Sequence, residues 1–222
     1  MATLGGWTVY AQSNEAERLR DAGKILEEIM NVPEQAIPTA ILEKAEAIAI
    51  FPSVIKGGFG IGAQHGRGVL SARNSETGGW SQPAFLSLNG GSFGAQFGVQ
   101  AVDLVLVVMN RRGLDNLLKN EFKIGANASV AAGPVGRGAE ASTDIGLRAE
   151  ILSYSRARGL FAGITLNGAA IQEDEDANKA FYGRPVSNRD LVDQVPKPVG
   201  TTGSEGTEAI NVWHSMLDRY TK

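Results

Sequence analysis

Two segments of this chain alternate glycine with larger side chains, and this alternation restricts the fold more than any other feature. In residues 54–70, five of the six glycines share one parity: Gly58, Gly60, Gly62, Gly66 and Gly68. Residues 86–99 repeat the pattern with Gly90, Gly94 and Gly98. Side chains of a strand point alternately to its two faces, so both segments are predicted strands with one glycine face. Glycine weakens a strand, so we expect close packing there or, alternatively, a ligand against the backbone.

The remaining hydrophobic pattern predicts an α+β fold. Helical spacing begins after Ser13 or Asn14, ends near Asn31, and returns at residues 207–220. A short strand is expected at residues 47–51, ended by Pro52, and a buried central strand at 101–109. Further strands are predicted at residues 122–132, 147–157 and 160–171. We therefore expect a bent, mostly antiparallel, glycine-rich sheet or partly closed barrel, with N- and C-terminal helices packed on it.

The chain is predicted to form one folded domain with an arm. Its 222 residues suffice for one sizeable core. Residues 13–183 contain the predicted sheet, and residues 184–206 form an arm rich in proline and glycine. Residues 207–222 are expected to form a helix packed on the same domain.

Charge and cysteine content narrow the classes of function. The formal net charge is −3, and the chain contains no cysteine. An acidic chain lacks the basic footprint of a nucleic-acid-binding protein, so we expect no nucleic-acid partner. Attraction to an anionic membrane would therefore need a local basic patch. The lack of cysteine excludes disulfides, thiolate metal ligands and cysteine nucleophiles.

Residues 153–163 contain the first candidate for such a patch. Tyr154, Arg156 and Arg158 share one strand parity, so their side chains would project together as ligands for an anion. The alternative is a solvated strand face along which the arginines extend. His65 and Arg67 lie close together with Lys56 upstream, and Arg137 lies in a glycine turn suited to phosphate.

The candidate site therefore comprises Lys56, His65, Arg67, Arg137, Tyr154, Arg156 and Arg158. Asp103 is a separate case, because it interrupts the apolar run of residues 101–109. A carboxylate buried in such a strand needs a partner, which we expect to be an arginine or backbone N–H groups.

Motifs that would indicate an enzyme do not fit their surroundings. Residues 90–94 match G-x-S-x-G around Ser92, but a nucleophile elbow needs a strand, a sharp turn and a helix, and here a strand continues. His65 and His214 are the only histidines of the chain. The acidic run 173–176 lacks the ligand spacing of a calcium loop and is interpreted as the solvated start of a helix. We expect no catalytic site, no metal and no cofactor.

Several segments together resemble the SYLF domain family of lipid-binding proteins. They are residues 51–52 with 56–60, then 102–110, 125–129, 131–137, 153–163, 176–178 and 181–183, in the order of that family. The resemblance covers roughly residues 15–183. It implies phospholipid binding, with phosphoinositides for eukaryotic members, and actin binding by some fungal members through an extension. Asn127 stands where the family pattern has an acidic residue.

The expected function is non-catalytic binding of anionic phospholipid, with phosphoinositide-like headgroups, at a membrane surface. The alternatives are a structural or protein-interaction module of the cell envelope, with a protein partner on the arm, and a lipid hydrolase. Val9-Tyr10-Ala11 has the small-residue spacing of a signal cleavage site, which predicts export to the periplasm or exterior. A cytoplasmic chain is the alternative.

Overall fold

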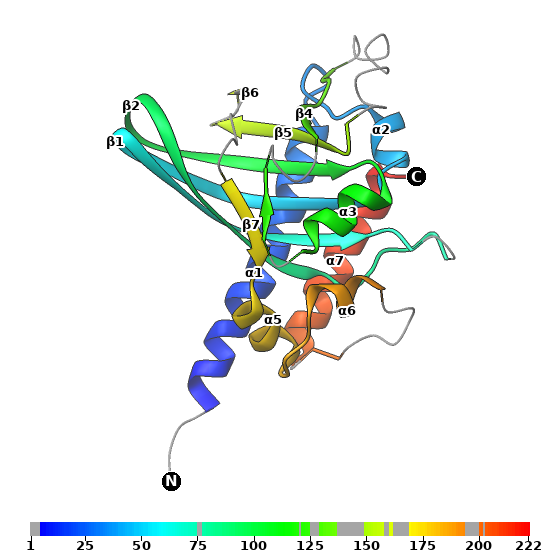
Figure 1. Cartoon of the computed structure of the whole chain (residues 1–222). Coiled ribbons are helices and arrows are strands. Elements are labelled where there is room, and N and C mark those ends of the chain that lie inside the picture. Colours follow the sequence, from blue (N-terminus) through cyan, green and yellow to red (C-terminus); the bar gives the residue numbers. More distant parts are fainter. Residues whose placement is uncertain are drawn as a thin grey trace.

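A computed structural model describes most of the chain, and Figure 1 shows it as a curled sheet with helices along one side. The described residues are 5–74, 77–119, 121–124, 129–136, 149–157, 160–161, 169–193, 200–201 and 203–222. Within these, the side chains of 5–13, 58–61, 92–98, 157 and 160–161 are left undescribed.

The fold is organised around one long antiparallel hairpin. Strand β1 (Ala47–Ala72) pairs with β2 (Ala84–Val108) along nearly its whole length, from Ala47↔Val108 to Leu70↔Ala84. The hairpin bends back on itself midway, at the upper left of Figure 1. The pairing shifts register there, between Phe59↔Phe97 and Ile61↔Phe93.

The bend packs one half of β1 against the other half through glycine. A Cβ atom built on Gly68 would lie 2.5 Å from Cδ1 of Phe51, and one built on Gly66 would lie 2.8 Å from Cγ2 of Val54. Real Cβ contacts are not this short, so only glycine fits at either position. The expected close packing of the glycine face is therefore confirmed at these two residues.

Shorter strands extend the hairpin into a mixed sheet. The far edge of β2 pairs antiparallel with β5 (Ile151–Ala157) near one end and with β7 (Ala169–Glu173) near the other. Strand β3 (Phe122–Lys123) joins β7, β6 (Leu160–Phe161) joins β5, and β4 (Val130–Ala132) runs parallel to β5. The described residues thus form a seven-stranded sheet that curls into a half-barrel, which confirms the predicted α+β architecture.

The N- and C-terminal helices pack together on this sheet. Helix α1 (Gly5–Met30) lies along α7 (Ser204–Tyr220) and also contacts β1. Trp213 of α7 is fully buried, and its Nε1 donates a hydrogen bond to Oγ of Ser71 at 2.9 Å. Two short helices, α2 (Thr39–Glu43) and α3 (Arg111–Leu117), follow α1 and β2 respectively.

Helices α5 (Glu175–Tyr182) and α6 (Asn188–Asp193) are attached to β2 by two buried asparagines. The backbone N–H of Phe85 donates to Oδ1 of Asn178 at 3.1 Å, and Nδ2 of Asn188 donates to the Phe85 carbonyl at 3.1 Å. The two asparagine side chains also bond to each other at 2.7 Å. Asn178 therefore has a scaffold role, and residues 184–206 include a helix that is docked on the sheet.

Four sequence expectations differ from the observed elements. Pro52 does not end a strand, and the segments predicted at 86–99 and 101–109 form the single strand β2. Helix α1 begins at Gly5, about two turns before the predicted cap, so Val9-Tyr10-Ala11 lies inside a helix. The strand predicted at 122–132 is represented by β3 and β4, which pair with different neighbours.

Candidate functional site

The seven predicted site residues do not form one cluster in the described part of the chain. Lys56, His65 and Arg67 lie on β1, whereas Tyr154 and Arg156 lie on β5. Arg137 and Arg158 fall outside the described residues. The two described arginines, Arg67 and Arg156, contact different acidic partners.

Arg156 is held between an acid of β2 and an acid of α1. It is the cross-strand partner of Asp103, and its Nη2 lies 3.4 Å from Oδ2 of that residue. The same nitrogen pairs with the Glu28 carboxylate. Only 18% of the Arg156 side chain is exposed, so its charge is largely balanced by the protein itself.

Asp103 uses its other oxygen to stabilise an irregularity of β1. Two residues, Pro52 and Ser53, oppose Asp103 alone, and Ser53 has a positive φ of 54°. This arrangement is a β-bulge, in which one backbone N–H loses its ladder partner. The Ser53 N–H donates instead to Oδ1 of Asp103 at 3.0 Å. The expectation that Asp103 has an arginine or backbone partner is confirmed, because it has both.

Tyr154 belongs to the core, so its side chain is not available to bind an anion at the surface. It is 1% exposed, and a Cβ atom built on Gly133 would overlap its ring. Its hydroxyl has no hydrogen-bond partner, and burial raises the pKa of the phenol. Shared parity with Arg156 therefore did not place the two side chains in one solvent-facing site.

Arg67 joins a network of two acids and two arginines that connects three elements. Its Nη2 lies 3.2 Å from Oε1 of Glu15 on α1 and 3.1 Å from Oδ2 of Asp174, the N-cap of α5. Arg18 contacts the same two acids, at 2.6 Å and 3.2 Å. Glu15 and Arg18 are buried; burial raises the pKa of the Glu15 carboxyl and lowers the pKa of the Arg18 guanidinium.

Sequence reasoning missed Glu15, Arg18 and Asp174, although a signal for the first two was present. Both lie on the same helical stripe as Leu19, Ala22 and Leu26, the residues that α1 buries. Charged residues on a buried stripe require partners of opposite sign, which here come from β1 and α5.

His65 and Lys56 have contrasting environments on the same strand. His65 is exposed, and its Nδ1 lies 2.7 Å from Oδ1 of Asn89 across the hairpin. Lys56 is only 8% exposed, and burial lowers the pKa of its ammonium group. Of the predicted cations that are described, Lys56 is therefore the one most deeply enclosed by the hairpin.

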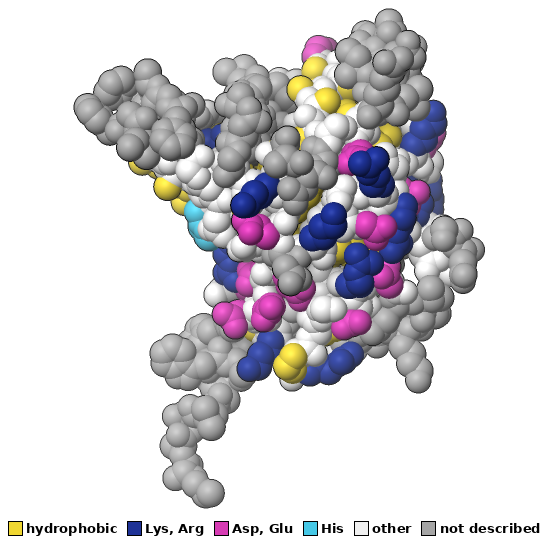
Figure 2. Space-filling view, in the orientation of Figure 1, with side chains coloured by type: hydrophobic (Ala, Val, Ile, Leu, Met, Phe, Trp, Pro, Cys, Tyr) yellow, Lys and Arg dark blue, Asp and Glu magenta, His cyan; other side chains and the backbone are white. Residues whose placement is uncertain are grey.

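The outer face of the hairpin near the bend, hereafter the outer face, is apolar and exposed. It comprises Ile55, Ala63, Val99 and Ala101, with exposures of 51% for Ile55 and 79% for Val99. Asp103 is the only acidic residue in β1 and β2. Figure 2 shows hydrophobic side chains along the left flank of the hairpin, whereas acidic side chains gather lower down, around α5 and α6.

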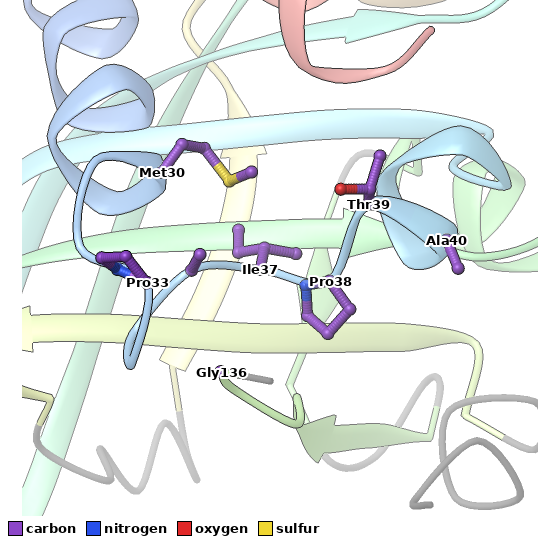
Figure 3. Close-up of a pocket in the computed structure, with 8 residues that line it drawn as sticks. Met30, Pro33, Ile37, Pro38, Thr39, Ala40 and Gly136 are labelled. Atoms are coloured by element: carbon purple, nitrogen blue, oxygen red, sulfur yellow. The ribbon is translucent and has the colours of Figure 1, made fainter. Parts of the chain in front are cut away.

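A second surface feature is the groove shown in Figure 3, between the α1–α2 connection and Gly136. Its volume is about 620 Å³, and its lining is mainly apolar, including Met30, Pro33 and Pro38. Gly136 has φ 73°, and its N–H donates to the Ala36 carbonyl at 3.0 Å. None of the described residues that line this groove has a charged side chain.

Neither a catalytic elbow nor a metal cluster is visible in the described residues. Ser92 lies within β2 opposite Gly62, so the strand continues where an elbow would turn into a helix. No three His, Asp or Glu side chains approach closely enough to hold a metal ion in the described ranges. Among the helices in the described ranges, none is long and apolar enough to span a membrane.

Comparison with known proteins places the chain in a family. Residues 89–205 match the family model Ysc84, described as "Las17-binding protein actin regulator". The chain is 33% identical over 215 residues to the SH3 domain-containing YSC84-like protein 1 of Homo sapiens, covering 94% of this chain and 61% of that protein. It is 37% identical over 153 residues to Protein YSC84 of Saccharomyces cerevisiae, covering 68% of this chain and 32% of that protein.

The SH3 domain-containing YSC84-like protein 1 of Xenopus laevis is 35% identical over 178 residues, with 78% of this chain and 52% of that protein covered. The chain thus spans about three fifths or less of these relatives. The family match covers more than half of the chain and agrees with the resemblance found in the sequence. The chain therefore belongs to the Ysc84 family, whose domain is also called SYLF.

Proposed function

We propose that this protein binds anionic phospholipid at a membrane surface through the outer face of its curled hairpin, without catalysis. The observation that carries the proposal is the exposure of Ile55 and Val99 on two strands whose single acid, Asp103, is already paired. The chain as a whole is acidic, with a net charge of −3. A surface free of acidic side chains is where such a chain meets least repulsion from an anionic membrane.

The apolar residues of this face supply the larger part of the expected attraction. Full burial of a side chain such as Val or Ile stabilises by about 1.5–3 kcal/mol. A basic residue near an anionic surface adds about 1 kcal/mol. Arg67 and Arg156 remain predicted phosphate ligands, but each would exchange an existing ion pair for the headgroup. Phosphoinositide-like headgroups are what the SYLF resemblance implies.

A protein partner is the second candidate function. The family is described as a Las17-binding actin regulator, and the human and Xenopus laevis relatives are named as SH3 domain-containing proteins. This description favours a protein-interaction role over one in a cell envelope. It also fits the cytoplasmic alternative for localisation better than export.

Vesicle co-sedimentation tests the lipid proposal. The wild type and the double variant Ile55→Ser/Val99→Ser would be compared on phosphatidylcholine vesicles with and without a phosphatidylinositol phosphate. We expect the wild type to require the anionic lipid and the double variant to bind at least about tenfold more weakly, since two apolar side chains lose their contact. The matched control is Val32→Ser/Val212→Ser, because both valines are exposed to 37% and lie away from the hairpin.

Equal binding by wild type and a folded Ile55→Ser/Val99→Ser variant would refute the outer face as the membrane contact. Co-sedimentation of the wild type with filamentous actin in the absence of vesicles, unaffected by the same substitutions, would favour the protein-partner candidate.

A further inference from the structure

Two buried polar residues of β1 lie on the inward face of the curl, on either side of the bend. Gly68 packs on Phe51, and Gly66 packs on Val54, so the contacts between the two halves of β1 step toward the bend. The next residues of the same inward parity are Lys56 on the first half and Gln64 on the second. Both are enclosed, with exposures of 8% and 3%.

Gln64 has an amide that the protein leaves unused. Both its Nε2 and its Oε1 are buried, and neither has a hydrogen-bond partner. Buried amide groups in native proteins nearly always have a partner, because an unsatisfied donor or acceptor is destabilising. An amide with both atoms unsatisfied therefore indicates a position that a ligand or water occupies.

The surroundings of Gln64 favour an anion as that ligand. Lys56 contributes a positive charge on the same inward face of β1. Gly90, the cross-strand partner of Gln64, and Gly62 on the same face add no side chain that would fill the space. A cation beside an amide donor is a combination that binds phosphate oxygens.

We propose that Lys56 and Gln64 form a phosphate-binding site inside the curl of the hairpin. The Lys56 ammonium and Gln64 Nε2 donate hydrogen bonds to phosphate oxygens, and Gln64 Oε1 accepts one from a protonated oxygen or a neighbouring hydroxyl. The inference rests on the proposed function, because the phosphate would belong to the lipid that the outer face contacts. A free phosphate offers the same chemistry, so the test uses both sources.

The test measures two probes separately on the full chain. One is inorganic phosphate, followed by its effect on the midpoint of thermal unfolding. The other is phosphatidylcholine vesicles carrying phosphatidic acid, followed by co-sedimentation. The variants are Lys56→Met and Gln64→Met, with Lys179→Met and Gln172→Met as controls, because those two residues are exposed on α5 and β7.

We expect Gln64→Met to bind the phosphatidic acid vesicles at least about tenfold more weakly than the wild type, since a charge-assisted hydrogen bond is lost. Phosphate should raise the unfolding midpoint of the wild type and of both controls but not of Gln64→Met or Lys56→Met. Without ligand, Gln64→Met should be at least as stable as the wild type, because two unpartnered polar atoms are removed. Gln64→Met thus remains informative even if Lys56→Met does not fold.

The outcomes separate this site from the proposed function. Loss for vesicles alone would still support the site and would identify the lipid headgroup as its ligand. Stabilisation by phosphate that is lost in Gln64→Met, in a wild type that binds no vesicles, would support the site while refuting membrane binding. If folded Gln64→Met responds to both probes as the wild type does, or if the wild type responds to neither, the site is refuted and Gln64 faces water only.

Discussion

The two flanks of the curled hairpin carry arginines paired with acids, whereas its outer face near the bend is apolar and exposed. Where helices dock, every described arginine of β1 and β5 is matched by acids: Arg156 by Asp103 and Glu28, and Arg67 by Glu15 and Asp174. On the outer face, Ile55 and Val99 are exposed, and the two strands carry no acidic residue other than Asp103. The difference indicates that the flanks hold the fold together, and it supports the proposal that the outer face contacts a membrane.

The largest loss of stability is expected from a substitution that prevents the hairpin from curling. Gly68→Val places a side chain against Phe51 and against the Ile50 carbonyl, which a Cβ atom at residue 68 would approach to 2.8 Å. Overpacking typically costs about 1–3 kcal/mol, and backbone contact places this variant at or above the upper end. The control is Gly200→Val, since nothing lies within 4 Å of a Cβ atom there. Equal urea midpoints for the two variants would contradict the observed curl.

The ion-paired flank should show the next largest effect. Arg18→Met leaves Glu15 buried with Arg67 as its remaining cation, and breaking a buried pair costs about 3–5 kcal/mol when a charge is left uncompensated. Because Arg67 still offers partial compensation, we expect the lower end of that range in urea unfolding. Arg189→Met removes exposed pairs to Asp115 and Asp193 and should cost less than about 1 kcal/mol. A similar small loss for Arg18→Met would show that the network does not anchor α1.

The smallest effect is expected for Arg156 in membrane binding. Its charge is balanced by Asp103 and Glu28, so Arg156→Gln should weaken binding to anionic vesicles by less than about fivefold, the value of one basic residue at such a surface. Ile55→Ser/Val99→Ser should have the larger effect in the same assay. If Arg156→Gln weakened binding more than Ile55→Ser/Val99→Ser, lipid recognition would be assigned to β5, as the shared parity of Tyr154 and Arg156 predicted.

The sequence predicted the architecture because periodicity reports directly on strand faces. The glycine parity identified the face that packs closely, and the apolar run around Asp103 indicated a buried strand whose acid needs a partner. Pro52 was misjudged because a proline can remain within a strand at a bulge. The Asp103 carboxylate that satisfies the Ser53 N–H comes from 50 residues away, and local sequence does not contain that contact.

The candidate site was less predictable for a related reason. Parity places Tyr154 and Arg156 on one face, but it does not say which element covers that face. The cover is supplied by Gly133 over the Tyr154 ring and by Glu28 of α1 on Arg156. Several residues that carry the family resemblance likewise have scaffold roles, as Asn178 shows by fixing the edge of β2 at Phe85.

The proposal that the outer face contacts the membrane is tested most directly by measuring how deeply this face enters a bilayer. The chain has no cysteine, so Val99→Cys creates a single site for a nitroxide label at a position that is 79% exposed. Val212→Cys on α7 is the control. With anionic vesicles, we predict that the residue 99 label becomes accessible to oxygen and shielded from a water-soluble relaxant, while the residue 212 label stays in water. A residue 99 label that remains fully accessible to the water-soluble relaxant on vesicle-bound protein would contradict the claim.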